Sequence, residues 1–188
     1  VTPFNGTNHK FKMRKNTQAI HLPYRRRDAY DALSMPVYNA VAYEFDDAKT
    51  MADAFCERID APDYSRCENP TVDNFEDRVR ALTDAFSVTA LNSGMAAISN
   101  IMLALTAQGK NVVSSTHMFG NTFDLLNRSL RKFGVGLHTT DLTDMEKVKQ
   151  AVDDNTCCIF GEIITNPQLE VADLAARASV AHEHHIPL

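Results

Sequence analysis

Short apolar segments alternate with longer segments of helical periodicity in the second half of the chain, and this alternation limits the folds it can adopt. Strands are predicted at residues 88–91, 111–115, 135–139 and 156–164, with the start of another at 186–188. Helices are predicted between them, at residues 98–105, 122–133, 145–152 and 171–184. Because strands joined by helices pair in parallel, the pattern predicts an α/β fold with a mostly parallel sheet flanked by helices. Ligands of such sheets gather where the strands end.

A turn of small residues follows the first predicted strand. Here Asn92-Ser93-Gly94 lead into a helix, so the free backbone N–H groups of Gly94, Met95 and Ala96 should surround one point. The positive end of the helix dipole adds to them, and Gly94 has no Cβ to block a ligand. Ser93 can cap the helix or donate its hydroxyl to an anion. The turn therefore predicts a phosphate or anion site, although an ordinary capped helix has the same pattern.

Three further groups of residues stand where a ligand of the sheet could reach them. Tyr64 and Arg66 offer a phenol and a guanidinium, both suited to phosphate oxygens, ahead of a helix that begins at an Asn-Pro pair. Phe119 follows the second predicted strand and could stack on a flat ring. Glu162 lies near the end of a later strand and Asn166 follows that strand, so they offer a carboxylate and an amide there. Each group alone is also typical of a surface ion pair, a core aromatic residue or a capped turn.

Composition narrows the class of protein. The 188-residue chain has a net charge of −5, and its one basic cluster, Arg25–Arg27, is followed by Asp28 and Asp31. We therefore expect no nucleic-acid partner and interpret the cluster as a solvated face or a salt-bridged arm. No apolar run is long enough to cross a bilayer and no targeting leader is recognisable, so we expect no membrane association and a cytoplasmic, reduced location.

Cysteine and histidine spacing gives no sign of a metal or disulfide site. Cys157 and Cys158 lie in a predicted strand and are interpreted as small buried hydrophobic residues. His182 and His185 are one helical turn apart and could share an ion, but a solvated helix end accounts for them better, so no metal site is predicted. His117 and His138 are interpreted as ordinary surface or hydrogen-bonded residues.

Residues 1–60 differ from the rest by prolines that interrupt regular structure and by many aromatic side chains. One helix is predicted there, from Asp46 to Ile59. Because this region is too sparse for a core of its own, we predict an N-terminal arm that contacts a neighbouring subunit; a disordered terminus is the alternative. Residues 61–188 then form the first, incomplete part of a larger domain, since the last predicted strand has only three residues.

Taken together and in this order, the motifs resemble the Cys/Met-metabolism family of pyridoxal-phosphate enzymes, which includes cystathionine synthases and lyases, methionine γ-lyases and O-acetylhomoserine sulfhydrylases. The resemblance covers nearly the whole chain, through Tyr64-Ser65-Arg66, Asn69-Pro70-Thr71, residues 93–98, Phe119-Gly120-Asn121-Thr122, and Glu162 with Asn166-Pro167. It implies the N-terminal part of a fold-type I, aspartate-aminotransferase-like large domain with an extended arm. It also implies pyridoxal 5'-phosphate as the cofactor.

The resemblance assigns roles to the residues of the turn and of the arm. The Gly94 and Met95 amides would hold the cofactor phosphate, with Ser93 as a further donor. Tyr64 and Arg66 would reach the same phosphate from a neighbouring subunit, which makes a homo-oligomer part of the site.

It also assigns roles at the strand ends. Phe119 would stack on the pyridine ring, and because most relatives have tyrosine there, it would lack their phenol. Asn166 would contact the phenolic oxygen of the cofactor, with Glu162 as a supporting residue.

The lysine that forms the Schiff base in this family would lie beyond Leu188, because none of the eight lysines matches its motif. The chain therefore resembles the N-terminal half of an enzyme, and we predict that it is catalytically inactive alone. Its motifs are most similar to those of O-acetylhomoserine sulfhydrylases, which implies γ-replacement on O-acetyl-L-homoserine by sulfide or a thiol. Asn121 stands where methionine γ-lyases typically have cysteine. Cystathionine γ-synthase or methionine γ-lyase activity, or a non-catalytic phosphate-binding scaffold, are the alternatives.

Overall fold

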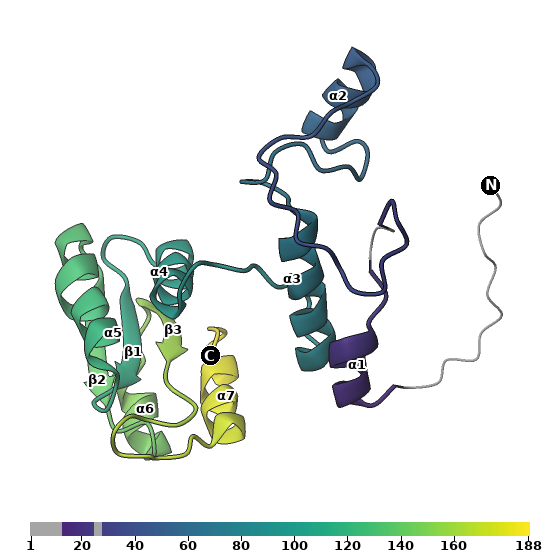
Figure 1. Cartoon of the computed structure of the whole chain (residues 1–188). Helices are drawn as coiled ribbons and strands as arrows, with labels where there is room; N and C mark the ends of the chain where they lie inside the picture. The colour runs from purple at the N-terminus through teal and green to yellow at the C-terminus, as the bar shows by residue number, and fades with distance from the viewer. Residues whose placement is uncertain (1–12, 25–27) are drawn as a thin grey trace. The chain divides into compact units, whose positions relative to one another are not determined.

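The computed structural model describes residues 13–24 and 28–188, and the chain divides into two compact units, residues 1–90 and 91–188 (Figure 1). Residues 1–12 of the predicted arm and the basic cluster Arg25–Arg27 lie outside the described residues. Each unit is described by itself.

The second unit is built on a parallel sheet of three strands. These are β1 (Asn111–Ser115), β2 (Gly136–Thr140) and β3 (Thr156–Phe160), in the order β2-β1-β3. The central strand β1 pairs with β2 without interruption from Asn111↔Gly136 to Ser115↔Thr140. The parallel sheet is thus confirmed, and the carboxyl ends of all three strands lie at one edge.

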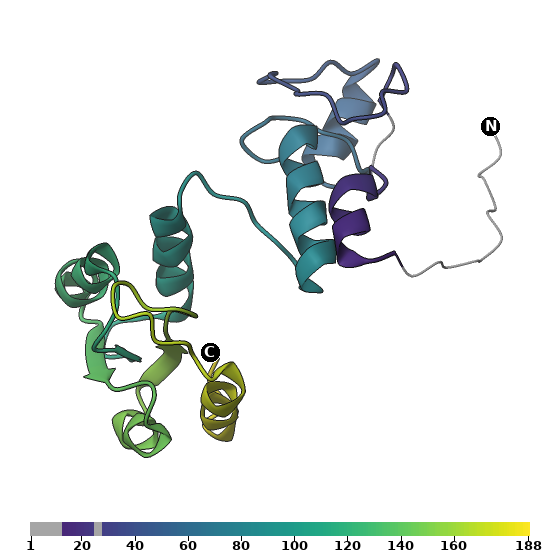
Figure 2. The ribbon, with the colours of Figure 1, turned by 60° about the horizontal axis from the view of Figure 1, so that its bottom comes forward.

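Helices cover both faces of this sheet, as Figure 2 shows: α4 and the α5 helix lie on one side, and α6 and α7 on the other. The α5 helix continues without a break through a π-helical and a 3₁₀ turn, and it ends at Gly134, whose φ of 79° lies in the left-handed region that favours glycine. The helical segments are α4 (Gly94–Leu105), α5 (Gly120–Asp124), η1 (Leu125–Ser129), η2 (Leu130–Phe133), α6 (Met145–Ala151) and α7 (Leu174–Glu183).

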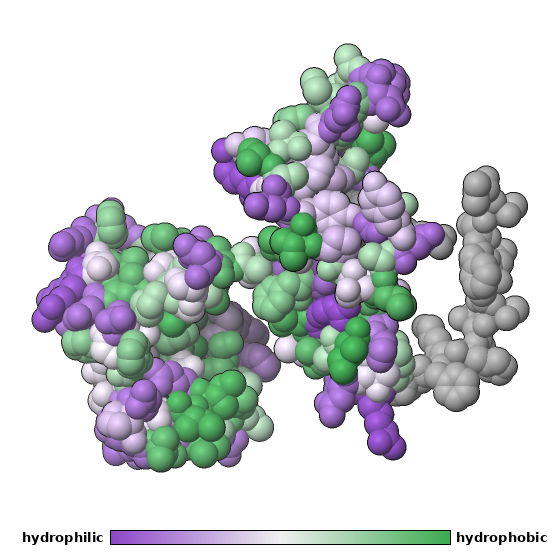
Figure 3. All heavy atoms as spheres, viewed as in Figure 1, coloured by the Kyte–Doolittle hydropathy of each residue, from purple (hydrophilic) through white to green (hydrophobic). Residues whose placement is uncertain are grey.

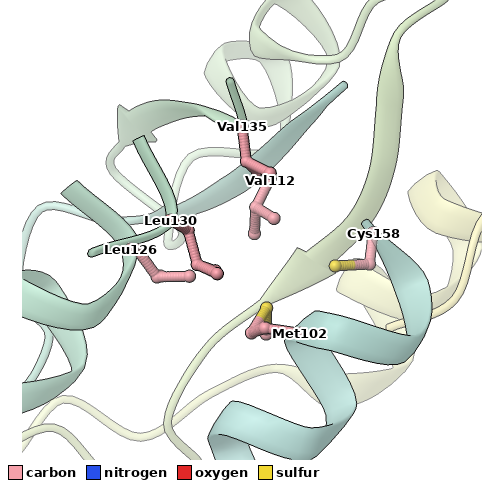
Figure 4. Close-up of a cluster of buried hydrophobic side chains, with 6 residues drawn as sticks. All are labelled: Met102, Val112, Leu126, Leu130, Val135 and Cys158. Atoms are coloured by element: carbon pink, nitrogen blue, oxygen red, sulfur yellow. The ribbon is translucent and has the colours of Figure 1, made fainter. Parts of the chain in front are cut away.

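Two apolar clusters, one on each face of the sheet, form the core. The first consists of Met102, Val112, Leu126, Leu130, Val135 and Cys158 (Figure 4). The second consists of Val113, Leu142, Val148, Ile159, Val180 and Ala181. Successive residues of β1 serve opposite clusters because neighbouring side chains of a strand point to opposite faces. All five residues of β1 are buried, as expected for the central strand of a parallel sheet covered on both sides.

Two predicted strands are absent from the described residues. Residues 88–91 have no ladder partner; the Ala90 N–H is instead donated to the Glu76 carboxylate at 2.6 Å. Residues 186–188 are not a strand either, but the Pro187 carbonyl accepts from the Ile159 N–H at 3.0 Å, along the outer edge of β3. A strand needs a neighbouring strand for its backbone hydrogen bonds, so an apolar segment alone does not suffice.

The apolar stripe of α4 is only partly buried. Met102 is fully buried, whereas Ile101 and Leu105 are 49% and 40% exposed. The two exposed residues line an apolar groove of about 470 Å³ beside β3 and α7. The helical period therefore predicted the helix correctly but not how much of its stripe is covered.

The described part of the first unit has three helices: α1 (Lys15–His21), α2 (Ala48–Phe55) and α3 (Pro70–Thr83). The start of α3 agrees with the sequence, because Asn69 caps it through a hydrogen bond from the Thr71 N–H and Pro70 is its first residue. The α2 helix is shorter than predicted. The α1 helix, which the sequence pattern did not predict, packs on α3, where Arg78 donates to the Ala19 carbonyl.

Candidate cofactor site

The start of α4 presents unbonded backbone donors. Ser93 caps the helix, and its Oγ accepts from the Ala96 N–H at 3.1 Å. The Ala97 N–H is donated to the Ser93 carbonyl, whereas the N–H groups of Gly94 and Met95 find no acceptor in the described part of the chain. Two amides are therefore available to a ligand, not the three expected, because the cap uses Ala96. The Ser93 hydroxyl hydrogen remains free to donate as well.

The space above Gly94 is open. A Cβ placed on Gly94 would meet no atom within 4 Å, apart from its chain neighbours and its own helix. The α4 helix has twelve residues and no acidic side chain in its first turn, so its dipole acts at this end without a competing carboxylate on the helix. Unbonded amides, a helix terminus and open space together fit a phosphate group.

Phe119 lies next to this helix start. The link is Thr122, which is buried in the first turn of α5 and whose hydroxyl lies 3.9 Å from the Met95 sulfur. Phe119 immediately precedes α5 and is 47% exposed, so a face of its ring is accessible to a ligand. The helix start and the aromatic ring thus share the carboxyl-terminal edge of the sheet.

Glu162 supports the main chain at Phe119. Its carboxylate accepts from the Phe119 N–H at 2.7 Å, and its own carbonyl accepts from the Arg177 guanidinium at 3.4 Å. Arg177 is 4% exposed and also donates to the Leu142 carbonyl at 3.0 Å. Burial lowers the pKa of Arg177, while the nearby carboxylates, Glu170 foremost, act in the opposite direction. The Arg177 guanidinium thus fixes the main chain of Glu162, and the Glu162 carboxylate in turn fixes the main chain of Phe119.

Asn166 lies at the tip of a hairpin-like loop after β3, defined here as the Asn166 loop (residues 163–172). An antiparallel bridge, Ile164↔Val171, closes the loop, and the buried Thr165 exchanges backbone hydrogen bonds across it. Its Asn166-Pro167 peptide bond is cis. The Asn166 side chain is exposed and makes no hydrogen bond with the described residues, so its amide is available to a ligand oxygen.

Tyr64 and Arg66 belong to the first unit. The Arg66 guanidinium lies over the Tyr64 ring, 4.9 Å from its centroid, a cation–π arrangement that orders both side chains. The other predicted site residues all belong to the second unit.

The segment that contains Tyr64 and Arg66 is attached to residues 36–43 of the predicted arm by a buried polar network. Asn69 is 8% exposed, and its side-chain amide donates to the Tyr38 carbonyl and to the Ser65 hydroxyl, both at 2.9 Å. The Ser65 hydroxyl in turn donates to the Ala40 carbonyl, and its N–H donates to the Val41 carbonyl. One side chain therefore caps α3 and fastens the arm.

Sequence inspection missed one contact at this edge. His117, interpreted as an ordinary residue, has its Nδ1 3.0 and 3.1 Å from the two carboxylate oxygens of Glu170. The partners are separated by 53 residues, so no local spacing could reveal the pair.

The described residues contain neither a metal-binding cluster nor a membrane-spanning helix. No group of three or more histidine, cysteine or acidic residues suited to a metal ion occurs in the described part of the chain. Within residues 13–24 and 28–188, no helix is long and apolar enough to span a membrane.

Comparison with known proteins identifies the family. Residues 16–188 match the family model described as Cys/Met metabolism PLP-dependent enzyme. The chain belongs to this family. Pyridoxal 5'-phosphate is the family's cofactor, as the resemblance implied, and the residues at the start of α4 fit its phosphate.

Relatives of this chain include two kinds of sulfur amino-acid enzyme. It is 34% identical to an O-acetyl-L-homoserine sulfhydrylase of Corynebacterium glutamicum, over 92% of this chain and 40% of the relative. It is also 34% identical to an L-methionine gamma-lyase of Fusobacterium nucleatum, over 88% of this chain and 42% of the relative. The chain thus spans about two fifths of the length of these relatives.

Solved structures confirm the fold. A crystal structure described as an O-acetylhomoserine (thiol)-lyase of Campylobacter jejuni superposes with a TM-score of 0.85 at 30% identity, over 93% of this chain and 43% of that one. That structure contains a pyridoxyl-lysine-5'-monophosphate group. The predicted N-terminal part of a fold-type I large domain is therefore correct.

Proposed function

We propose that the protein containing this chain replaces the acetate of O-acetyl-L-homoserine with sulfide or a thiol, giving homocysteine or methionine. The observation on which this depends is the pair of unbonded N–H groups on Gly94 and Met95, which face open space at the edge that also presents Phe119. A cradle of this kind suits the phosphate of a pyridoxal cofactor. The sulfhydrylase relative supports the choice of substrate.

Different residues of the second unit would bind different parts of the cofactor. Gly94 and Met95 donate to the phosphate, together with the Ser93 hydroxyl. The Phe119 ring stacks on the pyridine ring, and the Asn166 amide donates to the phenolic oxygen. When bound, pyridoxal phosphate supplies an electron sink that lets an amino-acid substrate exchange its γ-substituent.

Tyr64 and Arg66 would complete the phosphate site of a neighbouring subunit. Their phenol and guanidinium are the donors that a phosphate prefers, and the polar network at Asn69 orders the segment that presents them. A homo-oligomer in which the arm contacts the neighbour follows from this assignment.

The 188-residue chain by itself would not catalyse the reaction. The second unit has four lysines. Lys110 directly precedes β1 and Lys132 belongs to η2, shortly before β2, so both lie near the edge of the sheet opposite the site. Lys147 and Lys149 pair with Asp144 and Glu183. No lysine of the second unit therefore has the position of a Schiff-base residue, and we expect this unit to bind the cofactor only through non-covalent contacts.

The phosphate assignment is tested with pyridoxine 5'-phosphate, which has the ring and phosphate of the cofactor but no aldehyde. We expect it to slow amide hydrogen exchange at Gly94 and Met95, and Gly94→Val to abolish this protection because a branched side chain fills the cradle. Asn100→Val, an exposed position on the same helix, controls for a β-branched residue in α4. Protection that persists in Gly94→Val would contradict the assignment.

The reaction is tested on the full-length protein with O-acetyl-L-homoserine and sulfide, by measuring homocysteine. Release of 2-oxobutyrate from methionine, with no homocysteine formed, would instead assign the lyase activity of the Fusobacterium relative. No cofactor binding at all would favour the non-catalytic scaffold.

The subunit assignment is tested by mixing two inactive variants, Arg66→Ala and one that lacks the Schiff-base lysine. If Arg66 acts across the interface, hybrids contain one site with both groups intact and regain activity. Absence of rescue would place Arg66 in the site of its own subunit.

A further inference from the structure

The Asn166 loop is fastened to the segment before α5 at two points. Glu162, directly before the loop, accepts from the Phe119 N–H at 2.7 Å. Glu170, near the end of the loop, lies 3.0 Å from His117 Nδ1. Two carboxylates that flank Asn166 thus contact two residues of the 117–119 segment.

The second contact restricts the Asn166 loop further than the Glu162 contact alone. The Glu162 contact holds the base of the Asn166 loop, and the His117–Glu170 contact adds a second attachment closer to its tip. The loop transmits this constraint to its tip, because the Thr165 N–H donates to the Glu170 carbonyl at 3.1 Å and the Glu170 N–H donates to the Thr165 hydroxyl at 3.0 Å. Thr165, the neighbour of Asn166, is 3% exposed and therefore packed in place.

Other charged groups surround the pair. Asp141, at the end of β2, interacts electrostatically with His117, and Arg177 of α7 interacts with Glu170. The side chains of His117 and Glu170 are 41% and 34% exposed, so solvent screens their attraction in part. The pair is better suited to orienting a loop than to stabilising the whole fold.

We propose that His117 and Glu170 are positioning residues. They fix the position of the Asn166 amide relative to the Phe119 ring and thereby shape the binding site of the pyridine ring. This inference rests on the proposed cofactor function. Neither residue needs to touch the cofactor. Glu170 acts through Thr165, the neighbour of Asn166, and His117 acts through the short segment that leads to Phe119.

The test compares His117→Ala with His117→Asn in the full 188-residue chain. The asparagine amide can place a donor close to where the Nδ1 of histidine lies, so it should preserve the contact with Glu170. We expect His117→Ala to weaken the binding of pyridoxine 5'-phosphate about fivefold, as for the loss of one partly exposed hydrogen bond. Amide exchange at Thr165 and Ala172 should accelerate to a similar extent, while His117→Asn stays close to the unmodified chain in both measurements.

Each other outcome rejects the inference in a recognisable way. If His117→Ala accelerates exchange in the loop but binds the probe unchanged, the contact fastens the loop without positioning the site. If His117→Asn loses as much affinity as His117→Ala, the donor to Glu170 is not the cause. If the unmodified chain shows no protection at Gly94 and Met95, the proposed cofactor function fails and this inference fails with it.

Discussion

Different interactions stabilise the interior of each of the two units. The second unit buries an apolar cluster on each face of its sheet. In the first unit, Ala54 is the one buried hydrophobic residue among those described, and several large apolar side chains are open to solvent. They include Tyr30, Leu33, Val37, Phe55, Phe75 and Phe86. Figure 3 shows that the second unit also exposes hydrophobic residues, gathered at the start of α7.

The two units therefore differ in whether they form an apolar core of their own. A covered parallel sheet can form a core from its own residues, whereas the first unit relies on polar contacts around Asn69 and leaves its apolar surface uncovered. Large apolar side chains that are exposed without an apolar core beneath them favour burial against another surface. The comparison therefore supports the proposal that the arm contacts a neighbouring subunit.

Truncating a core residue of the second unit should have the largest effect. Met102 is fully buried, so Met102→Ala should lower the free energy of unfolding by about 3 kcal/mol through lost burial and the cavity left behind. Ile101→Ala, its half-exposed neighbour on α4, should cost much less. All five tyrosines lie in residues 1–90 and the chain has no tryptophan, so tyrosine fluorescence reports the first unit alone. Urea titration should shift the circular-dichroism transition and leave the tyrosine transition in place; a common shift would show that the units unfold together.

Thiol reactivity should separate the units next. Burial, with a smaller contribution from Cys157, raises the pKa of the Cys158 thiol from 9.0 to about 11. Each pKa unit is a factor of ten, so at pH 8 Cys158 has about 100-fold less reactive thiolate than an ordinary thiol. Cys56 and Cys67 of the first unit are exposed and should react first with iodoacetamide, as followed by peptide mass spectrometry. Equal labelling of Cys158 in the folded chain would mean that the core of the second unit opens readily.

Loss of the polar network should destabilise the first unit to a smaller extent. Asn69→Ala removes a helix cap and leaves the Tyr38 carbonyl without its donor, which should cost about 2 kcal/mol. Asn69→Asp keeps an acceptor for the Thr71 N–H but removes the amide donors, and should cost about half as much. Asp173→Ala removes a cap in the second unit and controls for capping alone. Tyrosine fluorescence during urea unfolding measures the first two; identical costs for Asn69→Ala and Asn69→Asp would show that the cap contributes nothing.

The smallest effect concerns acid stability. The Thr143 hydroxyl, together with the Thr143 N–H, lowers the pKa of Asp141 below its ordinary value of 3.8. A carboxylate whose pKa is lower in the folded state contributes stability that is complete above the ordinary value and is lost as the pH falls through the folded value. Thr143→Val should therefore move acid unfolding slightly toward higher pH, with Thr139→Val as an exposed control from β2. An unchanged acid midpoint would show that this carboxylate gains nothing from its donors.

Local patterns predicted most elements of the second unit. The apolar run at 111–115 matches β1, and Gly134 ends the helix before β2 as expected. Gly94 and Phe119 were identified as candidates because a small-residue turn and an aromatic residue at a strand end are visible in the sequence. Their roles toward the cofactor, like those of Tyr64 and Arg66, stay predictions.

The misses share one cause. Residues 88–91 have the composition of a strand but no partner strand in the described chain, and Ile101 belongs to an apolar stripe but is half exposed. The His117–Glu170 contact joins residues 53 positions apart. Whether a strand finds a partner, whether an apolar stripe is covered and which distant residues meet all depend on the rest of the fold. The residues of a single segment do not encode this.

The helices other than α1, the three strands of the sheet, the capped turn at Ser93-Gly94 and the family could all be inferred from the amino-acid sequence. The elements and the turn follow from periodicity, capping and backbone preference, which act over a few residues, whereas the family follows from the resemblance of the motifs. The structure was needed to show that two carboxylates fasten the Asn166 loop, because Glu162 and Glu170 meet Phe119 and His117 only when distant parts of the chain fold together. It also showed that the Ser93 cap uses the Ala96 N–H, which leaves two amides unbonded at the start of α4.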